Sequence, residues 1–225
     1  MSRPEVDAVV FDVNETLFSL ERLRPAFGDI GLEAALVPLW FAGLLRDGFA
    51  LTAQGGYRPF AEVAAETLRG LDERVDEASV AAVMAAMREL QPHPDVEPAL
   101  QALRARGVPV ATLTNGGVEV VRALLDRAGL ADLVARNLSV DAVQRWKPAP
   151  EPYRHAATEL GVTPERLTLV AAHPWDCAGA HAAGLPAAWV NRSRARWPAV
   201  FPAPDVSGTD LIAIIDELLS SGRSC

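Results

Sequence analysis

The sequence predicts an α/β protein whose core is a doubly wound, Rossmann-like parallel sheet carrying an inserted helical cap. Two observations lead to this prediction. Strand-like and helical patterns alternate from residue 92 to the end of the chain, and a purely helical stretch separates this alternation from one early strand. Strands joined through helices form right-handed crossovers, which give a parallel sheet covered on both faces. Half of the 225 residues are hydrophobic, enough to bury such a core.

The first expected strand is the apolar run at residues 8–10, which continues into residues 11–17, Phe-Asp-Val-Asn-Glu-Thr-Leu. The run is too short for a helix, and turn-forming residues follow it, so it predicts a central strand that opens into a loop. Parallel sheets bind ligands at this carboxyl end of their strands. Asp12 is expected there, either as a nucleophile or as the cap of the next helix.

A helical pattern runs from about residue 20 to about residue 90, with apolar residues at helical spacing. Gly55-Gly56 interrupts the pattern, and Pro92-His93-Pro94 ends it because these residues cannot continue a helix. We therefore predict a helical cap at residues 19–91 and an α/β core at residues 1–18 and 92–225.

Helix and strand patterns then alternate to the end of the chain. The expected helices are residues 96–106, 118–128, 152–160, 177–183 and 211–219, and the expected strands are residues 108–114, 138–140, 167–172 and 187–190. The chain shows no internal repeat and no low-complexity tract.

The composition limits the partners. The formal charge of −8 argues against nucleic acid or an anionic membrane, which need a basic face, so a small anionic substrate would need local positive charge inside a pocket. Without an apolar signal segment or a stretch of membrane-spanning length, we expect a cytoplasmic protein. Cys177 and Cys225 lack metal-binding spacing and predict neither a disulfide framework nor a zinc site; Cys177 should be a small buried hydrophobe and Cys225 part of a frayed tail.

One cap segment is more apolar than a single amphipathic stripe requires. It contains Trp40, Phe41, Leu44 and Leu45. Either burial against the core or a homodimer through the cap helices explains this excess.

Three further polar clusters fall where strands are expected to end. Thr114-Asn115-Gly116-Gly117 could cradle an anionic oxygen or be an ordinary turn. Lys147 precedes a helix and has Tyr153 six residues further on, although an exposed lysine is the usual case. His173-Pro174-Trp175-Asp176 follows the strand at 167–172, and Asp176 there could simply cap a helix.

Together the four clusters place Asp12, Thr114, Lys147 and Asp176, in this order, at the ends of successive strands. This order resembles the haloacid dehalogenase superfamily, whose pattern is a nucleophilic Asp, a Ser or Thr, a Lys and an acidic residue. The resemblance covers nearly the whole chain, and the helical segment takes the place of the superfamily's cap.

Two branches of the superfamily differ at the clusters. In its magnesium phosphatases, a second Asp two residues after the nucleophile protonates the leaving group, and another Asp, four residues before Asp176, holds the metal. This chain has Asn14 and Ala172 at those positions. An amide is not a general acid, and Mg²⁺ prefers carboxylate oxygen.

The details are instead similar to the type II 2-haloacid dehalogenases, which use no metal. The matching residues are Thr16, Thr114-Asn115-Gly116, Lys147 with Tyr153, and Trp175-Asp176. The departures are Asn14 for a Tyr, His173 for an Asn, Ala171 or Ala172 for a Ser, and Phe41 after Trp40 for the arginine that receives the halide.

The resemblance implies that Asp12 attacks the halogen-bearing carbon of a small 2-haloalkanoic acid, haloacetates included, and that water then hydrolyses the aspartyl ester to a 2-hydroxy acid. Lys147 would keep Asp12 ionised, and Asp176 would orient Lys147 or activate the water. Thr16 and Thr114 complete the implied catalytic set. The implied substrate-binding residues are Asn14, Asn115, Tyr153, His173, Trp175, Trp40 and Phe41.

No cofactor and no metal are implied for this activity. Two other hypotheses stay open: a Mg²⁺-dependent phosphatase of small organic phosphates, and a protein of the same fold that binds a small anion without turning it over. His173 can carry a positive charge near neutral pH and is a candidate donor to the departing halide; a loop histidine bonded to backbone is the other interpretation.

Overall fold

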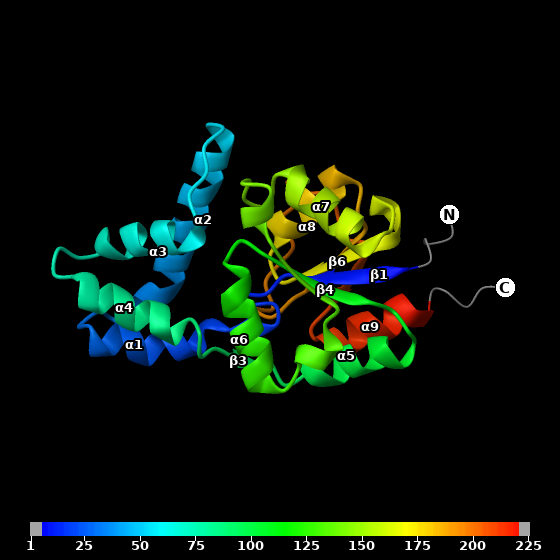
Figure 1. Ribbon diagram of the computed structural model, residues 1–225, viewed down its shortest axis with the longest axis horizontal. Coiled ribbons are helices and arrows are strands. Elements are labelled where there is room, and N and C mark those ends of the chain that lie inside the picture. Colours follow the sequence, from blue (N-terminus) through cyan, green and yellow to red (C-terminus); the bar gives the residue numbers. More distant parts are fainter. Residues whose placement is uncertain (1–5, 221–225) are drawn as a thin grey trace.

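The computed structural model describes residues 6–220, and these residues form a six-stranded parallel sheet with helices on both faces (Figure 1). In spatial order the strands are β5 (Arg136–Ser139), β4 (Val110–Thr114), β1 (Ala8–Phe11), β6 (Leu167–Ala171), β7 (Ala187–Val190) and β8 (Val206–Gly208). The predicted α/β parallel-sheet fold is confirmed. β8 was not predicted because an edge strand of three residues, including Ser207 and Gly208, has no apolar run to mark it.

The helices of the core cover the two faces of the sheet. One face carries α5 (Val96–Ala105), α6 (Val118–Ala128) and α9 (Leu211–Ser220), and the other carries α7 (Pro150–Leu160) and α8 (Pro174–Ala183). Side chains of β1 alternate between them, since Val9 and Phe11 pack in one apolar cluster and Ala8 and Val10 in the other. This burial on both faces explains why the strand reads as a continuous apolar run.

The helices α1 (Leu23–Asp29), α2 (Val37–Ala53), α3 (Phe60–Arg69) and α4 (Glu77–Ala86) lie together beside the core, at the left of Figure 1. The chain leaves the core through β2 (Phe18–Ser19) and returns through β3 (Gln91–Pro92). These two short strands pair antiparallel, with Phe18 opposite Pro92. The predicted limits of the cap, residues 19 and 91, lie in this pair, and we keep that division as a proposal.

Aromatic contacts join the cap to the core. The ring centroids of Phe49 and Trp175 are 4.9 Å apart, and those of Phe60 and Trp146 are 5.8 Å apart. Such pairs stabilise by about 0.5–1.5 kcal/mol each beyond their buried area. Trp146 also donates its indole N–H to the carbonyl of Arg58 and its backbone N–H to Thr52 Oγ1. The cap is therefore anchored directly at the residue that precedes Lys147.

We expect Gly48→Ala to destabilise the protein. Gly48 lies in α2 against Trp146, and a Cβ atom there would overlap with the indole ring. Overpacking of this kind costs about 1–3 kcal/mol. Gly43→Ala is the matched control, because a Cβ at Gly43 of the same helix meets nothing within 4 Å and alanine favours a helix. Denaturant unfolding should show a loss for the first variant only; equal stabilities would contradict this packing.

One sequence prediction about length was wrong. Within residues 6–220, the helical segment Ala34–Ala53 is long and apolar enough, by length and composition alone, to cross a membrane. One third of it is buried inside the protein, and core helices pass the same test.

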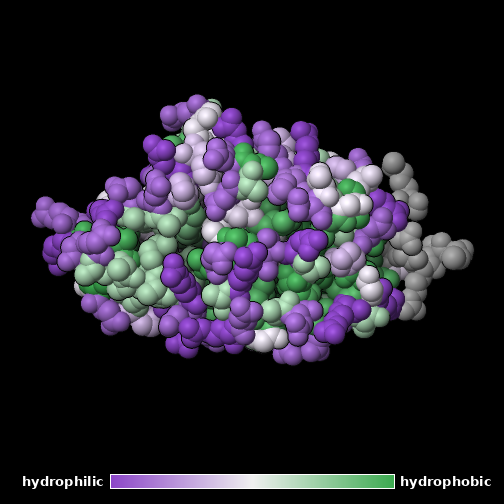
Figure 2. Space-filling view, viewed as in Figure 1, coloured by the Kyte–Doolittle hydropathy of each residue, from purple (hydrophilic) through white to green (hydrophobic). Residues whose placement is uncertain are grey.

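Trp40, Phe41, Leu44 and Leu45 are all buried, so packing within the subunit explains the apolar excess of this segment. The outer surface over α4, which is rich in alanine, is mildly apolar in Figure 2.

Candidate active site

The parallel sheet brings the four polar clusters together at one edge. Asp12 directly follows β1, and Thr114 is the last residue of β4. His173 lies two residues after the end of β6. Lys147 reaches the same point from the segment before α7. Sequence analysis expected α8 to begin at residue 177, but it begins at Pro174, so Trp175 and Asp176 lie in its first turn and His173 is its N-cap. Asp176 therefore does not cap the helix.

Asp12 is almost completely buried and is bonded through both of its oxygens. Its Oδ1 accepts a hydrogen bond of 2.9 Å from Lys147 Nζ, and its Oδ2 accepts one of 2.7 Å from the Thr16 hydroxyl. Thr16 Oγ1 in turn accepts the backbone N–H of Ala172 at 2.9 Å. Asp12 caps no helix in this arrangement; its carboxylate is fixed at the carboxyl end of the central strand.

Lys147 is fully buried, which rules out the exposed lysine that its type alone suggests. Its ammonium donates to Asp12 Oδ1 at 2.9 Å, to the carbonyl of Leu113 at 2.9 Å and to Asp176 Oδ2 at 2.6 Å. All three N–H bonds are used, which a buried charge requires. One ammonium thus bridges two carboxylates.

Tyr153 fixes the position of Asp176 through a hydrogen bond. Both side chains are fully buried, and the Tyr153 hydroxyl donates to Asp176 Oδ1 at 2.6 Å. Gly179 gives this hydroxyl room, since a Cβ there would lie 2.5 Å from it. The predicted contact of Tyr153 with substrate does not fit this position, because Asp176 lies between the hydroxyl and Lys147.

The segment after β4 forms a compact turn beside Asp12. Thr114 Oγ1 accepts the backbone N–H of Gly116 at 2.9 Å, and the Ser139 hydroxyl donates to the Gly116 carbonyl at 2.8 Å. Asn115 Oδ1 accepts the backbone N–H of Lys147 at 2.9 Å, so the turn also fixes the position of the lysine. Sequence reasoning missed Ser139, which comes from the neighbouring strand and has no motif of its own.

His173 lies close to Asp12 and next to two aromatic rings. Its Nδ1 is 3.4 Å from Asp12 Oδ2, and its Nε2 is 2.8 Å from Glu15 Oε2. Its ring stacks on Trp175 at 5.2 Å and lies 6.1 Å from the ring of Phe41. Sequence analysis missed Glu15, whose side chain is directed to His173 by a backbone φ of 62° that no pattern reveals. The backbone-bonded loop histidine is therefore not what the structure shows.

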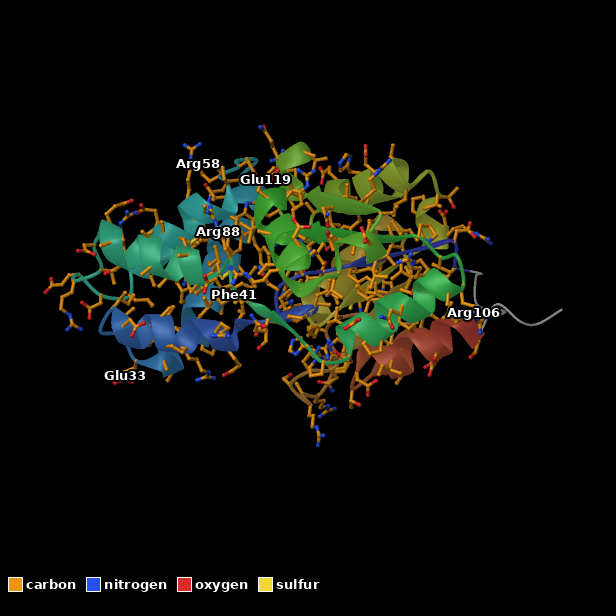
Figure 3. The ribbon with its side chains drawn as sticks, turned by 60° about the horizontal axis from the view of Figure 1, so that its bottom comes forward. Glu33, Phe41, Arg58, Arg88, Arg106 and Glu119 are labelled. Carbon is orange, nitrogen blue, oxygen red and sulfur yellow. The ribbon has the colours of Figure 1, made fainter. Side chains whose placement is uncertain are left out.

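The two other cap residues proposed for substrate binding differ in position. Phe41 faces His173, whereas Trp40 donates its indole N–H to the carbonyl of Ala64 and packs on Phe27 inside the cap. Figure 3 shows Phe41 on the cap side of the boundary with the core. Trp40 thus supports the position of Phe41 and makes none of the described contacts with Asp12, Lys147 or Asp176.

A cavity of about 240 Å³ lies between cap and core beside the cluster. Val13, Asn14, Thr114 and Gly117 line it from the core, and Met84, Met87 and Arg88 line it from the cap. Figure 3 shows Arg88 and Glu119 at this boundary. A larger cavity of about 750 Å³ lies in the cap between α2 and α3, but none of the clustered strand-end residues lines it. Of the predicted site residues, Asn14 and Thr114 line the smaller cavity.

The charges around Asp12 control its ionisation. Burial raises the pKa of the Asp12 carboxyl, but Lys147 and His173 outweigh burial and hold this pKa well below its ordinary value. Burial lowers the pKa of Lys147, and the two carboxylates more than compensate and raise it. Burial raises the pKa of Asp176, and the charge of Asp12 adds to this despite the nearby ammonium. Asp12 is therefore ionised although its side chain is buried.

We expect a pH-dependent stability that depends on His173. Burial lowers its pKa, but Asp12 and Glu15 raise it from 6.5 to about 9. The proton therefore stabilises the folded state fully below pH 6.5, and this contribution is lost as the pH rises through about 9. The shift corresponds to about 3 kcal/mol at most. Between about pH 6 and pH 10, the wild-type unfolding free energy should fall toward that of His173→Asn; parallel curves would contradict the assigned ion pairs.

The residues at this site do not fit a divalent metal. Both side-chain oxygens of Asp176 are bonded, to Lys147 and to Tyr153, and Ala172 stands where the phosphatase pattern has a second carboxylate. Among residues 6–220, no group of three or more His, Cys, Asp and Glu side chains is arranged to hold a metal ion. Mg²⁺ prefers carboxylate oxygens from the protein, and those of Asp176 are already bonded to Lys147 and Tyr153.

The fold and the site define a capped α/β protein with an Asp-Lys-Asp centre at the end of its central strand. A family described as haloacid dehalogenase-like hydrolase matches residues 6–184. The chain belongs to this family of hydrolases, and the predicted resemblance is confirmed.

Relatives and solved structures agree with this assignment. The chain is 32% identical over 198 residues to an (S)-2-haloacid dehalogenase of Xanthobacter autotrophicus, covering 83% of this chain and 76% of that one. It is 28% identical over 223 residues to haloacetate dehalogenase H-2 of Moraxella sp. strain B, covering 94% and 97%. A structure of L-2-haloacid dehalogenase from Xanthobacter autotrophicus with chloropropionic acid covalently bound superposes with a TM-score of 0.87 at 27% identity, over 97% and 100% of the chains.

Proposed function

We propose that this protein hydrolyses the carbon–halogen bond of small 2-haloalkanoic acids, haloacetates included, through an ester formed on Asp12 and without a metal. The observation that carries the proposal is the state of Asp12, an ionised carboxylate held through both oxygens by Lys147 and Thr16. The names of the relatives, haloacetate dehalogenase and (S)-2-haloacid dehalogenase, support this class of substrate.

In the first step an oxygen of Asp12 attacks the carbon at position 2 of the substrate, and the carbon–halogen bond breaks as the halide leaves with the bonding electrons. This substitution inverts the configuration of that carbon. Attack needs the charged form of Asp12, which Lys147 and His173 maintain. After attack the charge of Asp12 is lost, and Lys147 remains paired with Asp176.

The carboxylate of the substrate needs donors beside Asp12. Thr114 and Asn14 line the cavity next to Asp12, and Asn115, whose Oδ1 accepts the backbone N–H of Lys147, is proposed to donate its amide N–H bonds to the anion. The rings of Trp175 and Phe41 both pack near the ring of His173 and supply apolar surface there. Hydrogen bonds to a charged group contribute about 1.5–3 kcal/mol each, enough to favour a carboxylate over a neutral analogue.

The side chains of Asn14 and Asp176 give less support to the phosphatase hypothesis. Cleavage of a phosphate ester needs a proton donor for the leaving oxygen, and the amide of Asn14 is not an acid. The oxygens of Asp176 that could assist a metal are already bonded. Neither of these groups is needed when the leaving group is a halide ion.

Halide release from fluoro-, chloro- and bromoacetate and from both enantiomers of 2-chloropropionate tests the proposal, with a chelator present. We expect the protein to release halide in the presence of the chelator. We also expect that it does not hydrolyse an aryl phosphate. Phosphate release that requires Mg²⁺ would contradict the proposal. Saturable binding of the haloacids without any halide release would instead favour an anion-binding protein, with Phe41 in place of the cap arginine as the cause.

A homodimer and a cytoplasmic location stay predictions. The four cap residues first proposed for the dimer are buried in the subunit, so a dimer surface needs other residues. Leu39 of α2, 60% exposed beside the cavity between α2 and α3, is the best-placed apolar residue for it. Light scattering should show a dimer that Leu39→Glu converts to a monomer; a monomeric wild type would contradict this prediction.

A further inference from the structure

The second half of the proposed reaction needs a base for the hydrolytic water. Sequence analysis gave Asp176 as one candidate, but its Oδ1 is bonded to Tyr153 and its Oδ2 to Lys147, each at 2.6 Å, and its side chain is fully buried. A water molecule could reach Asp176 only by breaking one of these bonds. The base must therefore come from another side chain near Asp12.

His173 is the side chain with a nitrogen atom available beside Asp12. Its Nδ1 is 3.4 Å from Asp12 Oδ2 and has no hydrogen-bond partner among the described residues, although it is buried. The carbonyl carbon of an Asp12 ester is one bond beyond that oxygen. Stacking on Trp175 and contact with Phe41 limit the rotation of the ring, so Nδ1 stays directed to Asp12.

Glu15 orients the imidazole from the other side. Its Oε2 is 2.8 Å from His173 Nε2, so in the neutral ring the proton lies on Nε2 and the lone pair lies on Nδ1. The loop holds Glu15 in a left-handed conformation, φ 62°, and its backbone N–H donates to the carbonyl of Phe18 at 2.7 Å. A non-glycine residue adopts this conformation at a cost, which the surrounding structure must offset.

We propose that His173, oriented by Glu15, is the general base that activates water for hydrolysis of the Asp12 ester. The inference rests on the proposed function, because it concerns the second step of that reaction. A base that is held by a carboxylate and faces the acylated group is the arrangement that hydrolytic triads use.

The charge of Asp12 controls when His173 can act as a base. In the free protein Asp12 and Glu15 both favour the imidazolium, which carries a positive charge at neutral pH. When Asp12 becomes an ester, one of these two negative charges is lost, and the imidazolium releases its proton to solvent. This proton is the one that the overall conversion of a haloacid and water to a hydroxy acid and a halide produces.

The neutral imidazole then completes the reaction. The water oxygen bonds to the Asp12 carbonyl carbon while a water proton passes to Nδ1. The bond between this carbon and the substrate oxygen breaks, and the departing oxygen takes the proton back from Nδ1 to give the 2-hydroxy acid. Asp12 is left as a carboxylic acid, which transfers its proton to Nδ1 and restores the ion pair of the resting site.

Rapid mixing of excess 2-chloropropionate with the wild type and with His173→Asn tests the proposal. Asparagine is a good N-cap, so the variant is expected to keep α8. His181→Asn is the matched control, because it removes a second imidazole–carboxylate pair on the same helix, 2.9 Å from Asp205 and away from Asp12. Halide is measured over time, and the intact protein mass is measured after a rapid quench.

We expect His173→Asn to release about one halide per protein and then to slow by about 100-fold or more, with a carboxyalkyl group accumulating on Asp12. Glu15→Gln should slow the same second phase less, and His181→Asn should behave as the wild type. A His173→Asn variant that turns over like the wild type, or that loses the first halide and the later turnovers equally without a trapped ester, would overturn the role of His173. Absence of halide from the wild type would overturn the proposed function and this role with it.

Discussion

Lys147→Met is expected to abolish activity and to destabilise the fold strongly. The ammonium is fully buried and is bonded to two buried carboxylates, Asp12 and Asp176. Its removal leaves Asp176 with only the Tyr153 hydroxyl and Asp12 with only Thr16 and His173, and breaking such a buried pair costs about 3–5 kcal/mol. The carboxyl pKa values would then rise, so that Asp12 would be partly protonated at neutral pH and could not attack. Denaturant unfolding and halide release measure the two effects.

A second substitution separates the two effects of losing Lys147. Adding Asp176→Asn to Lys147→Met removes one uncompensated carboxylate and should recover part of the lost unfolding free energy. Activity should not return, because Asp12 still lacks the ammonium of Lys147. If Lys147→Met is as stable as the wild type between about pH 6 and pH 8, the buried ion-pair network is assigned incorrectly.

Asp12→Asn is expected to remove halide release, by a factor of about 10⁴ or more, and to leave the fold intact. The amide has nearly the same shape and can still accept from Lys147 or Thr16 through its oxygen. It has no charge to displace a halide, and Lys147 retains Asp176 as its counter-ion. Steady-state halide release and thermal unfolding, each compared with the wild type, provide the measurements.

Thr112→Val is a suitable control for Asp12→Asn. Thr112 is buried in β4, next to β1, and its hydroxyl bonds to Asn137 and to none of the site residues. Its loss should reduce stability by about 1 kcal/mol and leave halide release close to wild type. Activity retained in Asp12→Asn would exclude Asp12 as the nucleophile.

The architecture of the site was largely predictable from the sequence. Parallel strands place their carboxyl ends at one edge, so the positions of Asp12, Thr114 and His173 after three apolar runs implied that they would meet. Lys147 was also expected at a strand end, but it lies on the connection between β5 and α7, and only the structure shows that it is buried. Its role was inferred from the resemblance.

The remaining details depended on tertiary contacts. Tyr153 was expected at the substrate because its spacing from Lys147 matched a pattern, but spacing does not give depth, and the structure places it beneath Asp176. Trp40 was expected at the site, but its indole N–H donates to the carbonyl of Ala64 in α3. Glu15 was overlooked because its contact with His173 depends on a backbone conformation that sequence patterns do not report.

His173 of the core supplies positive charge where the resemblance leads one to expect an arginine from the cap. Where the resemblance leads one to expect a cation from the cap, Phe41 packs its ring against His173, which is itself a cation at neutral pH. Positive charge near Asp12 thus comes from Lys147 and His173, both of which the core supplies. We expect the activity of the protein to depend on these two residues more than on any polar residue of the cap.

The central claim is that Asp12 is esterified during turnover. The direct test is a single turnover in water enriched in oxygen-18, with protein in excess over 2-chloropropionate. Since water attacks the carbonyl carbon of the ester, the label should appear in the Asp12 carboxylate, and the lactate formed should carry none. Lactate that carries the label after the first turnover, with Asp12 unlabelled, would mean that water attacks the substrate directly and would contradict the account.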